Sequence, residues 1–457
     1  MHKDLKLFND LVEFLLSEEK NNPVAKPIET DLLYKTLDLS LNEHPALDAD
    51  FKQTLLDIVK YTPKTASTSF FNQLFGGRLS KATLGDLLAV MLNNSMYTYK
   101  VAGPQVGIEK SILHNICKII GYKTDSDGTF APGGSMSNLM AMIMARDKYN
   151  VTVRNEGVNQ KMTLYTSEAS HYSISKNASL MGIGRNNVRL VKADDHGKMI
   201  ADDLNRLVKQ DIEKGYLPFF VNATAGTTVL GAFDDIASIS QVCKTHNLWL
   251  HLDGAYCGSV IFSNRYKSLV KDIELTDSFS LNAHKMLGTP LTCSIIVTQH
   301  KDQLHHSFSN EAEYLYQTDD DAFNLGKTSL QCGRRNDALK LWTLWKSVGG
   351  VGLEKIVDHQ FYLADVARKY IKEHPDYTLY SFSDSISICF NYKDISAQDL
   401  CTLLYQNSKL MVGYGTFNGD EFVRMVTINT SLKEEDILAF FTVIEQFVTD
   451  KKLISSY

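Results

Sequence analysis

Between residues 162 and 298, short hydrophobic segments typical of β-strands alternate with segments that have the periodicity of helices. We expect strands at Met162–Tyr165, Val188–Val191, Pro218–Val221, Leu248–Leu252, Ser278–Leu281 and Ser294–Thr298. Helices are expected between some of them, at 201–214 and 236–245. This alternation predicts an α/β fold with a largely parallel sheet, covered on both faces, that binds ligands at the carboxyl ends of its strands.

Polar and ionisable residues gather at these strand ends, and they are His171, Thr224, Asp253, Asn282, His284 and Lys285. Lys285, between His284 and the apolar Met286, indicates a partly buried amine. Burial lowers the pKa of an amine, as Schiff-base chemistry requires. Taken alone, this lysine is also typical of an ordinary surface position. Asp253 ends another strand 32 residues earlier (285 − 253), so a carboxylate and an amine can meet at one site.

A glycine-rich turn, Pro132-Gly133-Gly134-Ser135, precedes a helix expected over 139–148. Backbone N–H groups at such a helix start, with the hydroxyl groups of Ser135 and Ser137, offer a site to an anion such as phosphate. The alternative is that one of these serines simply caps the helix. Lysine, carboxylate, anion site and the imidazole of His171 together predict pyridoxal phosphate, which needs an amine and a carboxylate at its ring nitrogen.

The composition excludes several classes of function. The chain has 457 residues, 44% of them hydrophobic, and a net charge of −6, which gives no electrostatic footprint for nucleic acid or an anionic membrane. No segment approaches the ~18 apolar residues of a membrane span. Seven scattered cysteines without a CxxC pair argue for reduced thiols, and against disulfides or a zinc site. Because the N-terminus also lacks the features of a signal peptide, we expect a soluble cytoplasmic protein without a metal.

We expect three structural parts: an N-terminal helical arm (1–70), a large cofactor-binding α/β domain (71–346) and a small α+β C-terminal domain (347–457). An acidic segment between 308 and 327, which contains Tyr314, has no clear periodicity. A loop of this length is typical of an active-site lid, and a solvated acidic face is the alternative.

Seven motifs occur in one order between about Phe70 and Met425: Phe71-Asn72-Gln73-Leu74, Tyr97-Thr98-Tyr99, Pro132-Gly133-Gly134, and the segments Thr166–Ser173, Val221–Thr228, Leu248–Asp253 and Gln331–Arg334. In these motifs the chain resembles the group II pyridoxal-phosphate-dependent amino-acid decarboxylases, in the branch of the glutamate, cysteine-sulfinate and aspartate enzymes. The resemblance implies the fold type I architecture of aspartate aminotransferase. It also implies a homodimer with the active site at the subunit interface.

The resemblance assigns the cofactor site residue by residue. Lys285 would hold the cofactor covalently, and Asp253 would hold its pyridinium. His171 would stack on the ring, and Ala255 would pack on the opposite face. The phosphate and the ring edge would contact Ser135, Met136, Asn282, His284 and Thr224.

The substrate site also follows from the resemblance. Arg424 and Gln73 would bind the side-chain acid of the substrate, and Tyr314 would protonate the reacting carbon in the other subunit. Phe75 with Ser95 resembles the cysteine-sulfinate and aspartate enzymes, because a bulky ring shortens the pocket by about one methylene group, an effect of roughly 1–3 kcal/mol.

We therefore expect α-decarboxylation of aspartate to β-alanine, of cysteine sulfinate to hypotaurine, or of both. The alternatives are glutamate decarboxylation to GABA, another pyridoxal-phosphate decarboxylase or aminotransferase, and a cofactor-binding regulator without turnover. The chain departs from the family pattern at Lys100, Gly254, Tyr256 and Thr292. Gly254 and Tyr256 would change only the packing, whereas Lys100 and Thr292 put the charge and the polar contacts of the substrate pocket in question.

Overall fold

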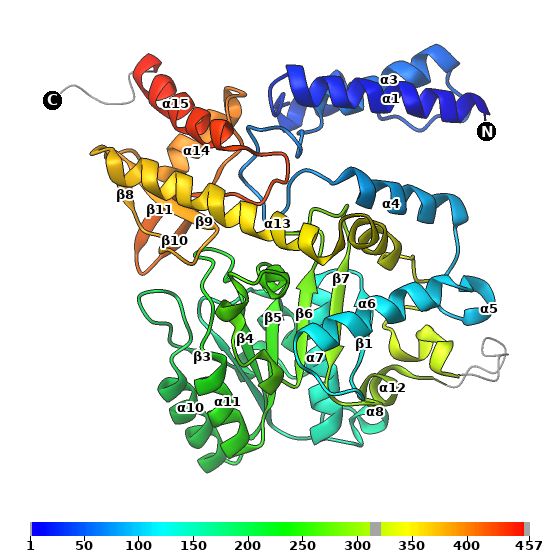
Figure 1. The fold of residues 1–457 in the computed structure, drawn as a ribbon, viewed down its shortest axis with the longest axis vertical. Helices are drawn as coiled ribbons and strands as arrows, with labels where there is room; N and C mark the ends of the chain where they lie inside the picture. Colours follow the sequence, from blue (N-terminus) through cyan, green and yellow to red (C-terminus); the bar gives the residue numbers. More distant parts are fainter. Residues whose placement is uncertain (1, 311–320, 452–457) are drawn as a thin grey trace. The chain divides into compact units, whose positions relative to one another are not determined.

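A seven-stranded sheet forms the centre of the unit that comprises Arg78–Tyr362 and Phe382–Ile386 (Figure 1). The computed structural model describes residues 2–310 and 321–451. In spatial order the strands are β1 (Asp127–Ala131), β7 (Ser294–Thr298), β6 (Ser278–Asn282), β5 (Trp249–Gly254), β4 (Leu217–Thr224), β2 (Met162–Ser167) and β3 (Val188–Val191). β7 runs antiparallel to both of its neighbours, whereas the pairs from β6 to β3 are parallel. The predicted α/β fold with a largely parallel sheet is confirmed.

The central strands β5 and β6 are buried along their whole length. Strands of a parallel sheet are buried because helices cover both faces of the sheet. Here α7 (Gly134–Tyr149) packs on β1, β4, β5, β6 and β7, while α10 (Ala201–Glu213) and α11 (Ile236–His246) pack on β4. Met140, Leu164 and Trp249 belong to the core between α7 and the sheet.

Strand β1 was not predicted from the sequence. Its residues Asp127-Gly128-Thr129-Phe130-Ala131 alternate small, polar and aromatic side chains and contain no hydrophobic run. Tertiary contacts define it instead, since it lies at the edge of the sheet and pairs with β7 from Asp127–Thr298 to Ala131–Ser294. β1 leads directly into the glycine turn at the start of α7.

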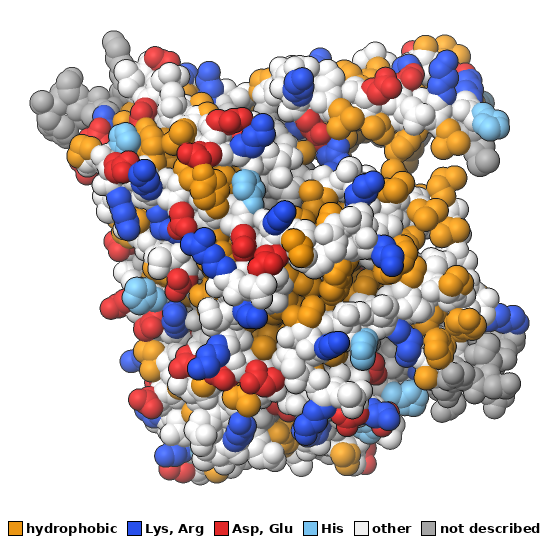
Figure 2. Space-filling model, viewed as in Figure 1, with side chains coloured by type: hydrophobic (Ala, Val, Ile, Leu, Met, Phe, Trp, Pro, Cys, Tyr) orange, Lys and Arg blue, Asp and Glu red, His pale blue; other side chains and the backbone are white. Residues whose placement is uncertain are grey.

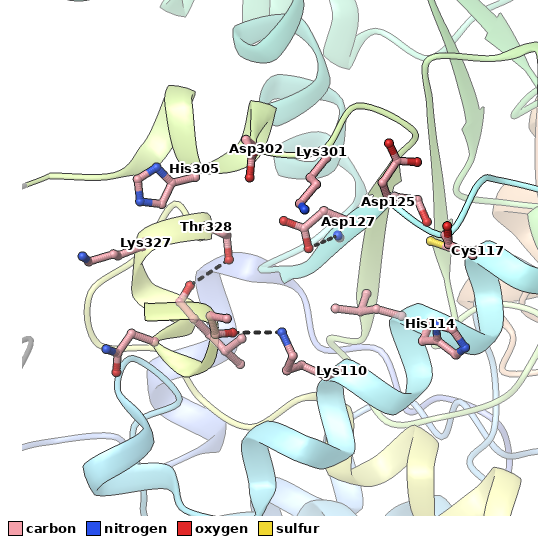
Figure 3. Close-up of a pocket in the computed structure, with 17 residues that line it drawn as sticks. Lys110, His114, Cys117, Asp125, Asp127, Lys301, Asp302, His305, Lys327 and Thr328 are labelled. Carbon is pink, nitrogen blue, oxygen red and sulfur yellow. Dashed lines mark hydrogen bonds between the residues drawn. The ribbon is translucent and has the colours of Figure 1, made fainter. Parts of the chain in front are cut away.

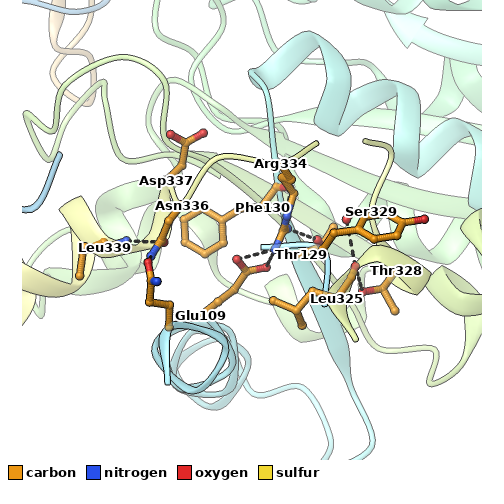
Figure 4. Close-up of polar contacts among 12 residues, drawn as sticks. Glu109, Thr129, Phe130, Leu325, Thr328, Ser329, Arg334, Asn336, Asp337 and Leu339 are labelled. Atoms are coloured by element: carbon orange, nitrogen blue, oxygen red, sulfur yellow. Dashed lines mark hydrogen bonds and ion pairs between the residues drawn. The ribbon is translucent and has the colours of Figure 1, made fainter. Parts of the chain in front are cut away.

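A buried ion pair braces this part of the unit (Figure 4). The Arg334 guanidinium donates to both carboxylate oxygens of Glu109, at 2.8 and 2.7 Å, from Nη2. Its Nη1 donates to Thr129 Oγ1 (2.9 Å) and to the Phe130 carbonyl (3.3 Å). The side chains of Arg334 and Glu109 are 4% and 1% exposed, so this pair ties α6 (Gln105–Ile119) and β1 together away from water.

The remaining helices of this unit, with their bounds, are α4 (Ser80–Leu92), α5 (Tyr99–Ala102), α8 (Val153–Glu156), α9 (Ser173–Leu180), α12 (Gln303–Phe308) and the start of α13 (Ala338–Glu373). Gly349 interrupts α13 with a φ of 67°, a backbone conformation that favours glycine. In the part of the chain that the structure describes, no helix has the length and apolar character needed to cross a bilayer.

The second unit comprises Met1–Gly77, Leu363–Ser381 and Ser387–Tyr457. Its antiparallel sheet has the order β10 (Gly413–Phe417), β11 (Asp420–Val426), β9 (Ser387–Tyr392) and β8 (Tyr377–Leu379). The helices are α1 (His2–Asn21), α2 (Leu33–Thr36), α3 (Asp48–Tyr61), α14 (Ala397–Gln406) and α15 (Glu434–Asp450).

Residues that the sequence assigned to an N-terminal arm belong to the same unit as this C-terminal sheet. Within the arm, the Ser69 carbonyl accepts from the Met411 N–H (3.0 Å). Just beyond it, the Phe71 N–H donates to the Met411 carbonyl (2.7 Å), and the Phe71 carbonyl accepts from the Val426 N–H (3.1 Å). The ring of Phe71 packs on Phe440, with centroids 4.8 Å apart. Backbone bonds and an aromatic contact therefore join segments more than 300 residues apart in the sequence.

Candidate active site

Lys285 lies in the turn that follows β6. Its N–H donates to the Asn282 carbonyl, which ends the strand, and its own carbonyl accepts from the Gly288 N–H, both at 3.1 Å. Burial lowers the pKa of the Lys285 amine, while the negative charge of Asp253 acts in the opposite direction. The turn therefore presents an amine whose neutral, nucleophilic form is favoured by its surroundings.

Asp253 lies near the end of β5, beside β6, with its backbone paired to Ser280. Its side chain is buried and accepts two hydrogen bonds, from the Ala255 N–H at Oδ1 (3.0 Å) and from Asn138 Nδ2 at Oδ2 (2.7 Å). The two donors hold both carboxylate oxygens of Asp253 in one orientation. A carboxylate held in this way can pair with a cation.

His171 follows β2 and precedes α9. Its Nδ1 accepts from the Ser173 N–H at 3.2 Å, so the neutral ring carries its proton on Nε2. Burial lowers the pKa of His171, the charge of Asp253 raises it, and the charge of Lys285 lowers it. The charges of Asp253 and Lys285 both act on this imidazole. Its neutral form can lie flat against a neutral or cationic ring.

The start of α7 forms the candidate phosphate site. The Met136 N–H donates to the Gly133 carbonyl (2.9 Å) within the first turn, and Asn177 Nδ2 donates to the Ser135 carbonyl (2.8 Å). The first N–H groups of a helix have no partner inside it, so those of Gly134 and Ser135 remain the donors for an anion. For Met136 the structure thus shows a backbone N–H already engaged by the turn.

Asn282 lies beside the helix start, and His284 follows it by two residues. A Cβ added to Gly134 would lie 2.8 Å from Asn282 Nδ2, which shows how closely this amide approaches α7. Among the described residues, the buried Asn282 Oδ1 has no hydrogen-bond partner, a state that a bound ligand would relieve. His284 Nδ1 accepts from the Cys293 N–H (2.9 Å), and burial together with Lys285 lowers the pKa of His284 to about 4. This imidazole is neutral at physiological pH.

Thr224 and Ala255 complete this edge of the sheet. The backbone of Thr224 pairs with Asp253, and its N–H donates to Asp234 Oδ2 at 2.7 Å. Burial raises the pKa of Asp234 to about 6. The Ala255 methyl group lies 3.2 Å from the Cβ that Gly134 lacks, so it borders the start of α7. Polar donors, an amine and a carboxylate thus surround one region with the chemistry that pyridoxal phosphate requires.

The predicted substrate residues are placed less directly. Ser95 lies in the same unit as Lys285, but its Oγ accepts from the Arg334 N–H and the Tyr97 N–H, both at 3.4 Å. It therefore braces the turn that contains Arg334. Tyr314 lies outside the described residues.

Gln73, Phe75 and Arg424 belong to the smaller unit. Gln73 is exposed, and the ring of Phe75 lies 6.4 Å from that of Phe70. Arg424 borders a cavity of about 340 Å³ and donates from Nη2 to the Asn72 carbonyl (3.0 Å). Their role in binding a substrate beside Lys285 stays a prediction.

Another cavity, of about 680 Å³, lies where β1 begins and α12 follows β7 (Figure 3). Lys110, Asp127, Lys301 and His305 are among its lining residues, and Lys110 Nζ donates to the Ala322 carbonyl (2.9 Å). Since β1 is parallel to β6, this cavity lies at the edge of the sheet opposite the carboxyl ends of β4, β5 and β6. None of the predicted site residues lines it.

Two residues of the site were missed from the sequence. Asn138 donates to Asp253, and His251 Nε2 lies 3.1 Å from Asn138 Oδ1. The sequence did contain an indication for His251. Side chains two residues apart on a strand point to the same face, and Asp253 follows His251 by two residues. Asn138 carried a weaker one, as a polar residue just ahead of a strongly apolar helical segment.

Comparison with known proteins agrees with this chemistry. Residues 31–393 match the pyridoxal-dependent decarboxylase conserved domain. The human cysteine sulfinic acid decarboxylase is 35% identical over 448 residues, which covers 92% of this chain and 90% of that protein. The acidic amino acid decarboxylase GADL1 of Xenopus tropicalis is 32% identical, with 97% and 93% covered.

Solved structures have the same fold. The crystal structure of mouse CSAD matches with a TM-score of 0.92 and 33% identity, covering 97% of this chain and 98% of that chain. The crystal structure of Oryza sativa TDC with PLP and tryptamine, at 22% identity, matches with a TM-score of 0.90 and coverage of 98% and 97%.

Proposed function

Because the chain belongs to the pyridoxal-dependent decarboxylase family, we propose that it releases carbon dioxide from a short acidic amino acid, cysteine sulfinate or aspartate. The chain is a pyridoxal-phosphate-dependent amino-acid decarboxylase with the type I fold. The observation that carries this function is the placement of Lys285, Asp253 and the start of α7 at one edge of one sheet.

The residues of the site fit the cofactor. Lys285 would hold it covalently, Asp253 would face its ring nitrogen, and the start of α7 with Asn282 and His284 would hold its phosphate. When bound, pyridoxal phosphate supplies an electron-withdrawing ring that accepts the electron pair left by a departing carboxyl group.

The protein prepares this chemistry by its electrostatics. Asp253, whose two carboxylate oxygens are held by two donors, would stabilise a positive charge at the ring nitrogen of the bound cofactor. Lys285, whose amine pKa is lowered by burial, can act as a nucleophile and can carry a proton near the reacting carbon. The neutral His171 adds no competing charge. We assign the final proton to Tyr314, on the resemblance alone.

The choice of a short acid is supported by two kinds of observation. The relatives reported above are named for cysteine sulfinic acid and acidic amino acids. By the resemblance, Phe75 and Ser95 would be the residue types of the short-acid enzymes, and Arg424 would provide a cation for the side-chain acid. Glutamate remains the alternative substrate. It is longer than aspartate by one methylene group, and a difference of one methylene group changes the discrimination between two substrates by only roughly 1–3 kcal/mol.

Substrate choice is tested by measuring carbon dioxide release from cysteine sulfinate, aspartate, glutamate and aromatic amino acids. We expect the two short acids to have the highest kcat/KM. In Phe75→Ala the kcat/KM for glutamate, divided by the kcat/KM for cysteine sulfinate, should rise at least about 10-fold. Phe417→Ala, a half-buried phenylalanine of the same unit, serves as the control. A wild-type preference for glutamate would reject the role of Phe75, and keto-acid formation without carbon dioxide would reject decarboxylation.

A homodimer is part of the proposal and is supported by an apolar surface on α4. Leu84, Leu87, Leu88, Val90, Met91 and Leu92 are all exposed, with Met91 at 61%. Figure 2 shows hydrophobic side chains gathered over this helix. Contiguous exposed apolar side chains mark an interaction surface.

Light scattering on Leu88→Arg/Met91→Arg tests this surface. We expect the mass of a monomer from this double variant and the mass of a dimer from wild type. Val151→Arg changes an exposed valine outside α4 and should leave the dimer intact. A dimer that persists in the double variant excludes α4 as the interface.

A cytoplasmic location completes the proposal. All seven cysteines lie within the described residues and none forms a disulfide bond, and six of them are buried. Free thiols persist in a reducing compartment. Fractionation of the native cells should place the protein and its activity in the same soluble fraction.

A further inference from the structure

Asn138 joins the elements that carry the candidate cofactor site. Its side chain is 1% exposed and comes from α7. Nδ2 donates to Asp253 Oδ2 (2.7 Å) and to Ser173 Oγ (3.1 Å), while Oδ1 lies 3.1 Å from His251 Nε2 and accepts from Ser280 Oγ (3.5 Å). A carboxamide can make four hydrogen bonds, and all four positions are engaged here.

The chemistry of the partners fixes the direction of these bonds. The NH₂ group of Asn138 donates to the Asp253 carboxylate, so its Oδ1 faces His251. His251 Nε2 must then donate, and its Nδ1 accepts from the Ser278 hydroxyl group at 2.9 Å. Ser278 Oγ in turn accepts from Trp249 Nε1 at 2.9 Å. A continuous series of donors therefore runs from Trp249 through Ser278, His251 and Asn138 to Asp253.

This series keeps the same direction at physiological pH. Burial lowers the pKa of His251 to about 4, so its ring remains neutral. A neutral ring with Nδ1 accepting has its only proton on Nε2, which is the tautomer that Asn138 requires.

We propose that Asn138 is a positioning residue, which fixes the Asp253 carboxylate toward the cofactor ring nitrogen and thereby sets the affinity for pyridoxal phosphate. The inference rests on the proposed function only in taking Asp253 as the partner of that nitrogen, and it does not depend on the substrate. A hydrogen bond to a charged group that is 2.7 Å long and fully buried is among the stronger single contacts in a protein.

Asn138→Asp separates orientation from packing, because aspartate has the same shape but donates only when protonated. Next to Asp253 and away from water, the new carboxyl has a raised pKa, and the two acids share one proton. The pair therefore restores the missing donor at low pH and loses it at high pH. Asn138→Ala has no donor at any pH.

The experiment measures the dissociation constant of pyridoxal phosphate for the cofactor-free protein between about pH 6 and about pH 8.5, with its thermal unfolding. Relative to wild type, Asn138→Ala should bind about 10- to 100-fold more weakly at every pH. Asn138→Asp should approach wild type at the low end and weaken at least about 10-fold at the high end. The control, Asn222→Ala, removes a buried amide bonded to Thr166 Oγ1 and should leave the affinity unchanged.

The inference is overturned if Asn138→Ala lowers the unfolding temperature but binds the cofactor as wild type does. It is equally overturned if Asn138→Asp shows the same ratio to wild type at every pH. Should Asn138→Ala fail to fold, the pH series of the isosteric Asn138→Asp decides alone. A wild-type protein that does not bind pyridoxal phosphate would instead contradict the proposed function itself.

Discussion

Replacing Gly134 with alanine places a methyl group where the first turn of α7 meets Asn282 and Ala255. The new Cβ would lie 2.8 Å from Asn282 Nδ2 and 3.2 Å from the Ala255 methyl group. Asn282 is 3% exposed and cannot turn into solvent. Ala255 is held by its backbone bond to Asp253 (3.0 Å). One of these groups must shift, at an overpacking cost of about 1–3 kcal/mol.

The shift should appear mainly in cofactor binding, because Asn282 is the more movable of the two groups. If the displaced amide costs the binding free energy of pyridoxal phosphate even about 1.4 kcal/mol, the dissociation constant of the cofactor rises about 10-fold. We expect at least this loss when the dissociation constant of the cofactor-free Gly134→Ala variant is measured by titration. Its unfolding temperature should fall by roughly 1–3 °C, because the unfolding entropy of a chain of this length is about 1 kcal/mol/K.

Gly107→Ala is the matched control, because this glycine lies in α6 and a Cβ there would meet nothing within 4 Å. It should leave cofactor affinity unchanged and stabilise the protein by about 0.5–1 kcal/mol, through the higher helix propensity of alanine. If Gly134→Ala binds and unfolds like wild type, the close approach of Asn282 to α7 is refuted.

Two further predictions concern buried charges. Glu109→Ala leaves the Arg334 guanidinium buried without its carboxylate and should destabilise the protein by about 3–5 kcal/mol, seen as a lower unfolding temperature. Acidification from about pH 7 to about pH 5 should also destabilise the protein. The pKa values of His251 and His284 are about 4 in the folded chain, below the ordinary value of 6.5. In this pH range the unfolded chain therefore binds more protons than the folded chain, which favours unfolding. Protonation of the two histidines lowers the free energy of unfolding by about 4 kcal/mol in total. Asp234, whose pKa is raised from 3.8 to about 6, increases the free energy of unfolding by about 1 kcal/mol over the same range.

Controls for these two predictions are available in the same chain. Glu373→Ala breaks an exposed pair with Lys369 and should change stability by less than about 1 kcal/mol. An equal effect of the Glu109 and Glu373 variants would contradict the importance of burial. A stability that rises on acidification would show that Asp234 outweighs the histidines.

The sequence predicted the part of the site that a single rule determines. Parallel strands bring their carboxyl ends to one edge, so Thr224, Asp253, Asn282 and Lys285 could be placed together without knowing the strand order. The glycines ahead of α7 likewise predicted a candidate phosphate site at the start of this helix, and phosphate binding there stays a prediction.

Contacts between segments far apart in the chain could not be predicted from the sequence. Asn138 and Asp253 are 115 positions apart, and Glu109 and Arg334 are 225 positions apart, so no periodicity links them. Strand β1 was missed for the same reason, because edge pairing with β7 rather than hydrophobicity defines it.

Covalent capture of the cofactor by Lys285 is the central claim, and reduction of the loaded protein with borohydride tests it directly. After digestion, mass spectrometry should find the reduced cofactor on the peptide that contains Lys285 and on no other lysine. The Lys285→Ala variant should carry no label and no fixed yellow colour. A label on a different lysine, or a label that persists in Lys285→Ala, would contradict the account.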